Sequence, residues 1–310
     1  MDPNNYAILT EIWRFHTPGG NKPGVMAFPA VLVFHAGISL MWVSVPVNIF
    51  TERRHIMSVT IKSEHEIELM REAGRILSIV HDEMAKIIRP GVTTMAINRK
   101  GEEVIRSYGC IPSFLNYNGY PASICVSVNE EVVHGIPDKK RVLKEGDIVS
   151  LDAGVIYKGY HSDAARTHAV GEISEEDKKL IAVTKQSFFE GVKMAKAGNH
   201  LFDISKAIQD YAESFGFSVV REMVGHGIGK KLHEEPQVPN FKPIGRGMRL
   251  RAGMTLAVEP MINRGKKEIW KLDDDWTCVT RDSQNSAHYE NTVLITEGEP
   301  ELFSYNKDLA

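Results

Sequence analysis

The stretch KEGDIVSLDAG at residues 144–154 recurs in weaker form as RAGMTLAVEPM at residues 251–261. The same shift along the chain places RPGVTTMAIN at 89–98 on KAGNHLFDIS at 196–205. Each copy has the pattern of two helices followed by strands, which is the signature of an internal repeat. The repeat predicts an α+β fold: two α-α-β halves, related by a pseudo-twofold axis, meet at a central antiparallel sheet with helices outside.

Acidic residues interrupt the apolar strands of this repeat. Asp152 lies in IVSLDAGVI and Glu259 lies in TLAVEPMI, and the shift superposes the two. Asp163 follows in YHSDAART, so a turn at Tyr157-Lys158 would place Asp152 and Asp163 directly opposite each other across a hairpin. A single acid of this kind is best explained as a surface-facing strand position. Several acids in one arrangement need another explanation.

A fourth acid, Glu290, precedes the apolar run of HYENTVLI. Converging carboxylates repel one another and lose solvation unless a positive charge lies between them. A divalent metal ion supplies that charge, and oxygen ligands with one imidazole suit manganese, iron, cobalt or zinc. His226 in MVGHGIGKKLHEEP is the imidazole candidate because its flanking glycines permit close approach of the backbone. For His226 or His233 alone, an ordinary core or loop histidine is the alternative.

These segments carry a likeness to a known family. MVGHGIGKKLHEEPQVPNF at 223–241 resembles the histidine signature of type I methionine aminopeptidases, and LDAG, HSDAART, AVEPM and HYENT resemble the family's other ligand segments. NYNGYPASICVSVNEEVVHGIP at 116–137 resembles its substrate-side segment. The likeness runs from Met57 to the C-terminus. It implies the pita-bread fold of peptidase family M24, with one catalytic domain over residues 57–310.

The resemblance implies an enzyme that removes the initiator methionine from nascent proteins, preferring a small second residue. It also implies two divalent metal ions per chain, of cobalt, manganese, iron or zinc. Asp163 and Glu290 would bridge the ions, Asp152 would complete one site, and His226 with Glu259 would complete the other. Glu259 would also carry a proton from the water to the leaving amine.

The resemblance further assigns the substrate side of the site. His134 and His233 would hold the substrate amide and stabilise the tetrahedral intermediate. A pocket for the thioether side chain of methionine needs aromatic and apolar groups, and the family's pocket positions carry Phe114, Tyr117, Tyr120, Cys125, Leu232 and Trp276. At two of these positions the chain has Phe114 and Leu232, where one form of the family has a cysteine and a phenylalanine. This difference leaves the fine substrate specificity open. Ordinary packing is the alternative for each pocket residue.

Composition and rival interpretations bound this hypothesis. The net charge of −3 does not indicate a basic surface for binding nucleic acid. The three cysteines form no CxxC pair, which favours a reducing compartment, here the cytoplasm. The rivals are a proline-specific aminopeptidase or dipeptidase of the same fold and a non-catalytic pita-bread binding module. The complete set of carboxylates disfavours the binding module. The expected partners are nascent polypeptides, with ribosome docking left open, and the family is usually monomeric.

Residues 1–56 do not match the rest of the chain. No charged residue occurs from Gly24 to Phe50, a stretch long enough to span a bilayer. Pro29 and Pro46 weaken a spanning helix there. We expect residues 1–56 to be an apolar N-terminal extension that lacks a fixed structure or results from an upstream start-codon assignment. Membrane anchoring through residues 24–50 is the less favoured alternative.

Overall fold

The computed structural model describes residues 26–34, 37–45 and 59–305, and the chain divides into two compact units, Met1–Ile56 and Met57–Ala310. The first unit contains an antiparallel hairpin of β1 (Met26–Phe34) and β2 (Gly37–Val45), which the sequence analysis did not predict. The other residues of the 1–56 extension lie outside the described residues, so its expected lack of fixed structure stays a prediction. No helix in the described ranges is long and apolar enough to cross a membrane.

A nine-stranded antiparallel sheet forms the centre of the second unit. Its strand order is β10-β9-β11-β16-β7-β6-β3, with β4 paired to β6 and β17 paired to β16. The two halves of the predicted repeat therefore meet where β7 pairs with β16. The strands are β3 (Ile111–Pro112), β4 (Ile124–Val128), β6 (Ile148–Tyr157), β7 (Tyr160–Ala169), β9 (Gly225–Gly227), β10 (Glu234–Val238), β11 (Thr255–Val258), β16 (Glu290–Leu294) and β17 (Glu301–Leu302).

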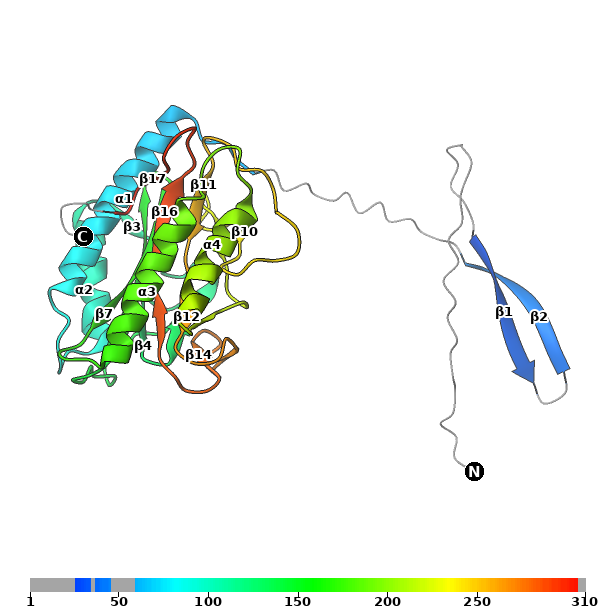
Figure 1. Ribbon diagram of the computed structural model, residues 1–310, viewed down its shortest axis with the longest axis horizontal. Coiled ribbons are helices and arrows are strands. Elements are labelled where there is room, and N and C mark those ends of the chain that lie inside the picture. Colours follow the sequence, from blue (N-terminus) through cyan, green and yellow to red (C-terminus); the bar gives the residue numbers. More distant parts are fainter. Residues whose placement is uncertain (1–25, 35–36, 46–58, 306–310) are drawn as a thin grey trace, which may run out of the picture. The chain divides into compact units, whose positions relative to one another are not determined.

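Helices cover one face of this sheet, and α1, α3 and α4 lie on the same side of it (Figure 1). Helix α1 begins with the capping box expected from Ser63-x-x-Glu66. The backbone N–H of Ser63 donates to Glu66 Oε2 at 2.8 Å, and the N–H of Glu66 donates to Ser63 Oγ at 3.4 Å. The helices are α1 (Glu64–Ala85), α2 (Thr94–Ser107), α3 (Glu175–Val192) and α4 (Leu201–Ser214).

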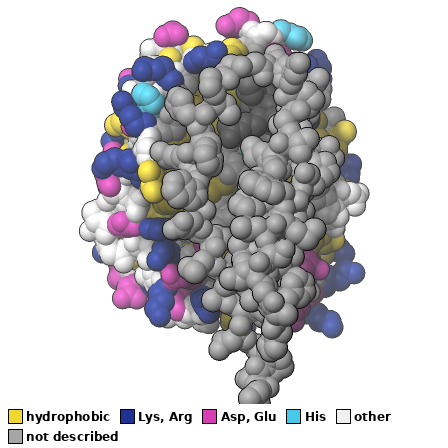
Figure 2. Space-filling view, turned by 90° about the vertical axis from the view of Figure 1, so that its right-hand side faces the viewer, with side chains coloured by type: hydrophobic (Ala, Val, Ile, Leu, Met, Phe, Trp, Pro, Cys, Tyr) yellow, Lys and Arg dark blue, Asp and Glu magenta, His cyan; other side chains and the backbone are white. Residues whose placement is uncertain are grey.

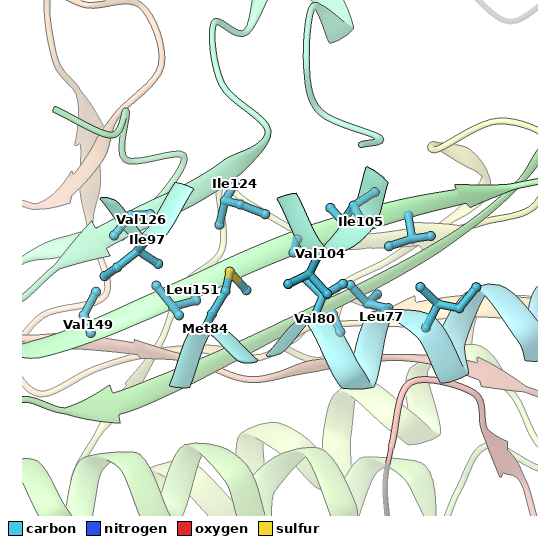
Figure 3. Close-up of a cluster of buried hydrophobic side chains, with 14 of the residues drawn as sticks. Leu77, Val80, Met84, Ile97, Val104, Ile105, Ile124, Val126, Val149 and Leu151 are labelled. Atoms are coloured by element: carbon cyan, nitrogen blue, oxygen red, sulfur yellow. The ribbon is translucent and has the colours of Figure 1, made fainter. Parts of the chain in front are cut away.

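An apolar core fills the space between α1, α2 and the sheet. Leu77, Val80 and Met84 of α1 point toward the sheet and share this core with Val149 and Leu151 of β6, and all five are fully buried (Figure 3). Each such side chain contributes roughly 1.5–3 kcal/mol through burial. Because strand side chains alternate, odd-numbered residues of β6 enter this core, and the even-numbered residues between them face the other side of the sheet.

Two three-stranded sheets complete the second unit. One contains β5 (Glu131–Val133), β14 (Cys278–Thr280) and β13 (Ile269–Lys271), and the other contains β8 (Ser218–Val219), β12 (Met261–Asn263) and β15 (Ser286–His288). They place His134 directly after β5, and Glu259 between β11 and β12. On the face drawn in Figure 2, acidic and basic side chains are interspersed wherever described residues are visible.

Candidate active site

The β6–β7 hairpin positions two of the predicted ligands. Its turn is Lys158-Gly159, whose φ values of 47° and 85° suit a two-residue hairpin loop with both central residues left-handed. The resulting register pairs Asp163 with Gly154, two residues beyond Asp152. The prediction that the two carboxylates directly oppose each other is therefore wrong, because the turn falls one residue later than assumed. They are diagonal neighbours on one face of the sheet, which is within reach of a shared ion.

The next strand brings a third carboxylate into line. Glu290 on β16 pairs with Ala165 on β7, and Ala165 also pairs with Asp152 on β6. The two acids thus flank a residue with a single methyl group, which leaves space between their carboxylates. Residues paired in one row of a sheet project to the same face. The sheet therefore arranges Asp152, Glu290 and the diagonal Asp163 around one volume.

The second half supplies the imidazole and the fourth acid. His226 on β9 pairs with Ala257 on β11, and Glu259 follows the end of that strand. The His226 Nε2 atom lies 3.9 Å from Asp163 Oδ2 and 3.6 Å from Glu259 Oε1. Among the described residues, Asp163, His226 and Glu290 each offer a ligand atom within 4.8 Å of the other two.

The hydrogen bonding of His226 shows what this cluster requires. Its Nδ1 lies 2.8 Å from the carbonyl oxygen of Gly227, which only accepts, so Nδ1 carries the proton. Burial lowers the pKa of His226 to about 3, and the ring is neutral at pH 7. Its Nε2 then carries no proton, and the lone pair of this nitrogen faces the carboxylate oxygens of Asp163 and Glu259. A nitrogen lone pair that faces carboxylate oxygens fits a cation bound between them. Histidines that bind metals usually donate a hydrogen bond from the other ring nitrogen, as Nδ1 of His226 does here.

The carboxylates show the same need for a cation. Burial raises the pKa of Asp152 to about 7, and it raises the pKa of Glu259 and of Glu290, assisted by neighbouring carboxylates. Burial, with the charges of Asp152 and Glu259, also raises the pKa of Asp163. Within the described residues, Asp152 Oδ1 and Glu290 Oε1 are buried without a hydrogen-bond partner. These residues fit divalent metal ions as ligands.

One cavity of about 260 Å³, called here the metal cavity, collects every side chain that was predicted for the site. Its acidic side carries the candidate ligands. Its apolar side belongs to a buried cluster that includes Phe114, Tyr120, Cys125, Leu232 and the partly buried Trp276. The complete lining is Phe114, Tyr117, Asn118, Tyr120, Cys125, His134, Asp152, Asp163, His226, Leu232, His233, Glu259, Trp276 and Glu290.

The two histidines predicted to hold substrate are fixed by their surroundings. His134 has φ 61°, a left-handed conformation that is costly for a residue with a side chain and is found at functional sites. Burial lowers the pKa of His134 to about 4, so its imidazole is neutral. His233 Nδ1 is hydrogen-bonded to the hydroxyl of Tyr117 at 2.7 Å. The His233 ring packs edge-on against His226, with centroids 4.2 Å apart.

Comparison with known proteins now identifies the family. Residues 68–297 match metallopeptidase family M24. The chain belongs to this family. A methionine aminopeptidase from Clostridium acetobutylicum is 55% identical over 246 residues, which cover 79% of this chain and 98% of that protein. A methionine aminopeptidase 1 from Bacillus subtilis is 52% identical over 239 residues, covering 77% and 96%.

Solved structures support the same assignment. The crystal structure of a methionine aminopeptidase from Thermotoga maritima matches this M24 chain with a TM-score of 0.79 and 45% identity, covering 80% of this chain and all of that one. The predicted likeness to type I methionine aminopeptidases and the predicted pita-bread fold are therefore confirmed. The roles of individual site residues in this M24 chain stay predictions.

Sequence reasoning missed one histidine that lies next to this M24 site, although it does not line the metal cavity. His288 is fully buried, and its Nε2 lies 3.8 Å from Glu259 Oε2. Asn118, in the turn of Tyr117–Gly119, lines the metal cavity itself and was not predicted. His288 precedes Glu290 by two residues within the HYENT segment, and strand alternation would have suggested that both face one side. No comparable signal marks Asn118.

Proposed function

We propose that this M24 chain is a metal-dependent exopeptidase that removes the N-terminal methionine from nascent polypeptides, preferring a small second residue. One observation carries the proposal: a single cavity joins a carboxylate cluster to an apolar wall. The cluster can hold metal ions beside the scissile bond. The apolar wall suits the unbranched thioether side chain of methionine.

The metal ligands would be Asp152, Asp163, His226, Glu259 and Glu290, shared between two divalent ions of cobalt, manganese, iron or zinc. When bound, such ions lower the pKa of a water molecule and polarise the scissile carbonyl. Support comes from the donor set, because buried carboxylates and one neutral imidazole suit these ions. The small side chain of Ala165 leaves the space in which ions would lie.

The remaining steps belong to protein groups. Glu259 would take a proton and return it to the leaving amine, since its carboxylate lies next to His226 and its pKa is raised by burial. The neutral imidazoles of His134 and His233 would donate hydrogen bonds to the substrate amide. The Tyr117 hydroxyl would hold His233 in the ring orientation needed for that bond.

The apolar wall would select methionine by shape. Tyr120 donates a hydrogen bond to the carbonyl of Gly135 at 2.9 Å and packs edge-on against Trp276, with ring centroids 5.1 Å apart. These contacts fix two aromatic rings before substrate arrives, which lowers the entropy cost of binding. Phe114 and Leu232 complete the wall from other segments of the chain.

Peptide hydrolysis tests the proposal. The full chain is stripped of metal and supplied with manganese, iron or cobalt. Met-Gly-Met, Met-Leu-Met and an Ala-Pro peptide are then compared. We expect metal-dependent release of methionine, fastest from Met-Gly-Met, with the proline peptide intact. Cleavage of the proline peptide alone would move the chain to the proline-specific branch. Failure to cleave any peptide with metal demonstrably bound would contradict the proposal and favour a binding module.

A further inference from the structure

A buried ion pair joins the segment ahead of α1 to the start of β10. Lys62 Nζ lies 2.8 Å from Glu234 Oε2, and the two side chains are only 4% and 12% exposed. Lysine and glutamate are rarely buried to this degree unless they are paired. Burying both charges costs solvation free energy, so such a pair is weak evidence for a role in stability alone.

The partners of Lys62 fix its ammonium in one place. Glu234 Oε2 accepts from the hydroxyl of Thr60 at 2.7 Å as well as from Lys62. Lys62 Nζ also donates to the Thr60 hydroxyl, and the backbone N–H of Lys62 donates to the carbonyl of Gly253 at 2.8 Å. Lys62 is therefore held at its backbone and at the end of its side chain.

The other oxygen of the same carboxylate closes a loop that belongs to the metal cavity. Glu234 Oε1 accepts from the backbone N–H of Lys231 at 3.2 Å. The two residues enclosed by this hydrogen bond are Leu232 and His233, and both line the metal cavity. The orientation of residues 229–234, called here the histidine loop, therefore depends on where the Glu234 carboxylate is held.

Gly229 leaves the space that the ion pair occupies. Its backbone is not left-handed, so conformation alone does not require glycine there. A Cβ at this position would lie 2.5 Å from Lys62 Cε and 2.6 Å from Glu234 Oε1, distances that side-chain carbons do not reach. The carbonyl of Gly229 also accepts from the N–H of His161 at 2.8 Å, which ties the histidine loop to β7. Local sequence and packing thus agree on one position for this loop.

We propose that Lys62 is a positioning residue that, through Glu234, holds the histidine loop in the orientation the peptidase reaction needs. Its ammonium is engaged by Glu234 and Thr60, so Lys62 itself contacts neither substrate nor metal. The inference rests on the proposed function of the residues in the histidine loop. It deepens that function by extending the site to the segment before the first helix of the second unit.

A second ion pair joins the same two parts of the chain but is exposed. Lys230 Nζ lies 3.5 Å from Glu66 Oε1, and the Lys230 side chain is 68% exposed. Lys230 belongs to the histidine loop, and Glu66 lies in the first turn of α1. Exposed pairs contribute little, because water and salt screen them. Lys230→Met is therefore the matched control for Lys62→Met.

Turnover of Met-Gly-Met by the metal-loaded full chain measures the effect of each lysine. Lys62→Met should lower kcat about tenfold, because a displacement of about 1 Å in a group that acts in the transition state can cost up to 10²-fold. Lys230→Met should change kcat by less than about twofold. Metal analysis should find the same content in both variants.

The double variant Lys62→Met/Glu234→Met separates position from stability. Lys62→Met alone leaves a buried carboxylate unpaired and should lower the unfolding temperature by roughly 10 °C. An apolar pair removes that penalty, so the double variant should regain most of this loss, and it replaces the single variant if that one does not fold. Its kcat should stay about tenfold low, because no carboxylate remains to hold the N–H of Lys231.

Histidine ring signals in NMR report the position of His233 without any turnover. The zinc-loaded full chain is used, because zinc has a filled d shell and leaves these signals sharp. We expect the His233 signals to shift in the double variant and to stay unchanged in Lys230→Met. His168 is the internal reference, since it lies at the other end of β7 from the residue that contacts the histidine loop.

Each result has one meaning. Recovery of kcat together with the unfolding temperature in the double variant would overturn the proposal, because the pair would then act through stability alone. Unshifted His233 signals would overturn it as well. Failure of the unchanged protein to release methionine would overturn the proposed function, whereas the His233 signals would still decide the positioning role of Lys62. A double variant that is stable, slow and shifted at His233, beside a normal Lys230→Met, would establish the proposal.

Discussion

The metal cavity and a second cavity of about 360 Å³ between α1, α3 and β7, the rear cavity, receive side chains from the same strand, yet their charge is opposite. Strand β7 sends Asp163 into the metal cavity and Arg166 and His168 into the rear cavity. In the metal cavity, carboxylate oxygens are left without partners. In the rear cavity, Arg166 is satisfied by protein acceptors and by the ring of Tyr289, 4.4 Å from its guanidinium carbon. The metal cavity therefore needs a cation from outside, whereas the rear cavity already contains one.

This difference separates chemistry from stability. Acids that repel one another contribute little to folding until metal ions bind, and their replacement should remove turnover while the fold persists. Arg166 joins β7 to β16 and to the C-terminal segment, so its replacement should act on stability first.

The largest effect is expected at Glu259. Glu259→Gln should lower turnover by roughly 10³–10⁴-fold, because the amide cannot carry the proton to the leaving amine. Its unfolding temperature should stay close to that of the unchanged protein. Glu103→Gln, an exposed acid on α2, is the control and should be fully active. Normal activity of Glu259→Gln on Met-Gly-Met would remove Glu259 from the mechanism.

His134 should show the next largest effect. His134→Ala is expected to lower turnover by about 10²-fold with metal content unchanged, by analogy with the loss of one oxyanion donor. Metal analysis of the purified variant distinguishes the possibilities. Loss of bound metal would mean that His134 is a ligand rather than a substrate contact.

Replacement of Arg166 tests whether the rear cavity contributes to the stability of the fold. Arg166→Met leaves the carbonyls of Glu290 and Ser304 without their donor, so the free energy of unfolding should fall by about 2–3 kcal/mol. Arg106→Met is the control, because Arg106 forms an exposed pair with Glu102 and should cost under about 1 kcal/mol. Denaturant unfolding measures both. An equal, small loss for the two variants would refute the structural role of Arg166.

Metal removal should expose the repulsion within the metal cavity. The pKa of Asp152 is about 7 in the metal-free fold against an ordinary 3.8, so the folded state holds the proton more tightly. A raised pKa stabilises the fold at low pH, and this contribution is lost as pH rises from about 4 to 7. The unfolding temperature of stripped protein should fall over that range, and added manganese should restore it. A stripped protein that becomes more stable with rising pH would contradict this account.

Tyr117 should give the smallest change. Tyr117→Phe keeps the aromatic wall but removes the hydroxyl that is bonded to His233 Nδ1. Turnover should fall about fivefold, the effect of one neutral hydrogen bond. The fall should appear in kcat rather than in KM if His233 acts in the transition state. An increase confined to KM would instead place Tyr117 in substrate binding.

Much of this architecture could be predicted from the chain, because acids inside apolar strands are rare enough to be informative. Asp152 and Glu259 were found through the repeat, and the sheet brings both to one cavity. The predicted turn of the β6–β7 hairpin was one residue too early. Lys158 adopts a left-handed backbone conformation, which is unusual for a lysine and could not be predicted from its residue type. Arg166 was missed because a lone arginine in a strand carries no periodic signal.

The pairing of β6 with β7 has a consequence for how the gene can change. Side chains alternate along a strand, so one inserted residue between Gly159 and Asp163 would turn the acid toward the helices and carry Arg166 to the opposite face. The two cavities would exchange charge in a single step. Insertions or deletions at this point are therefore tolerable only if they change the length by an even number of residues. The site depends on the number of residues in this segment as much as on their identity.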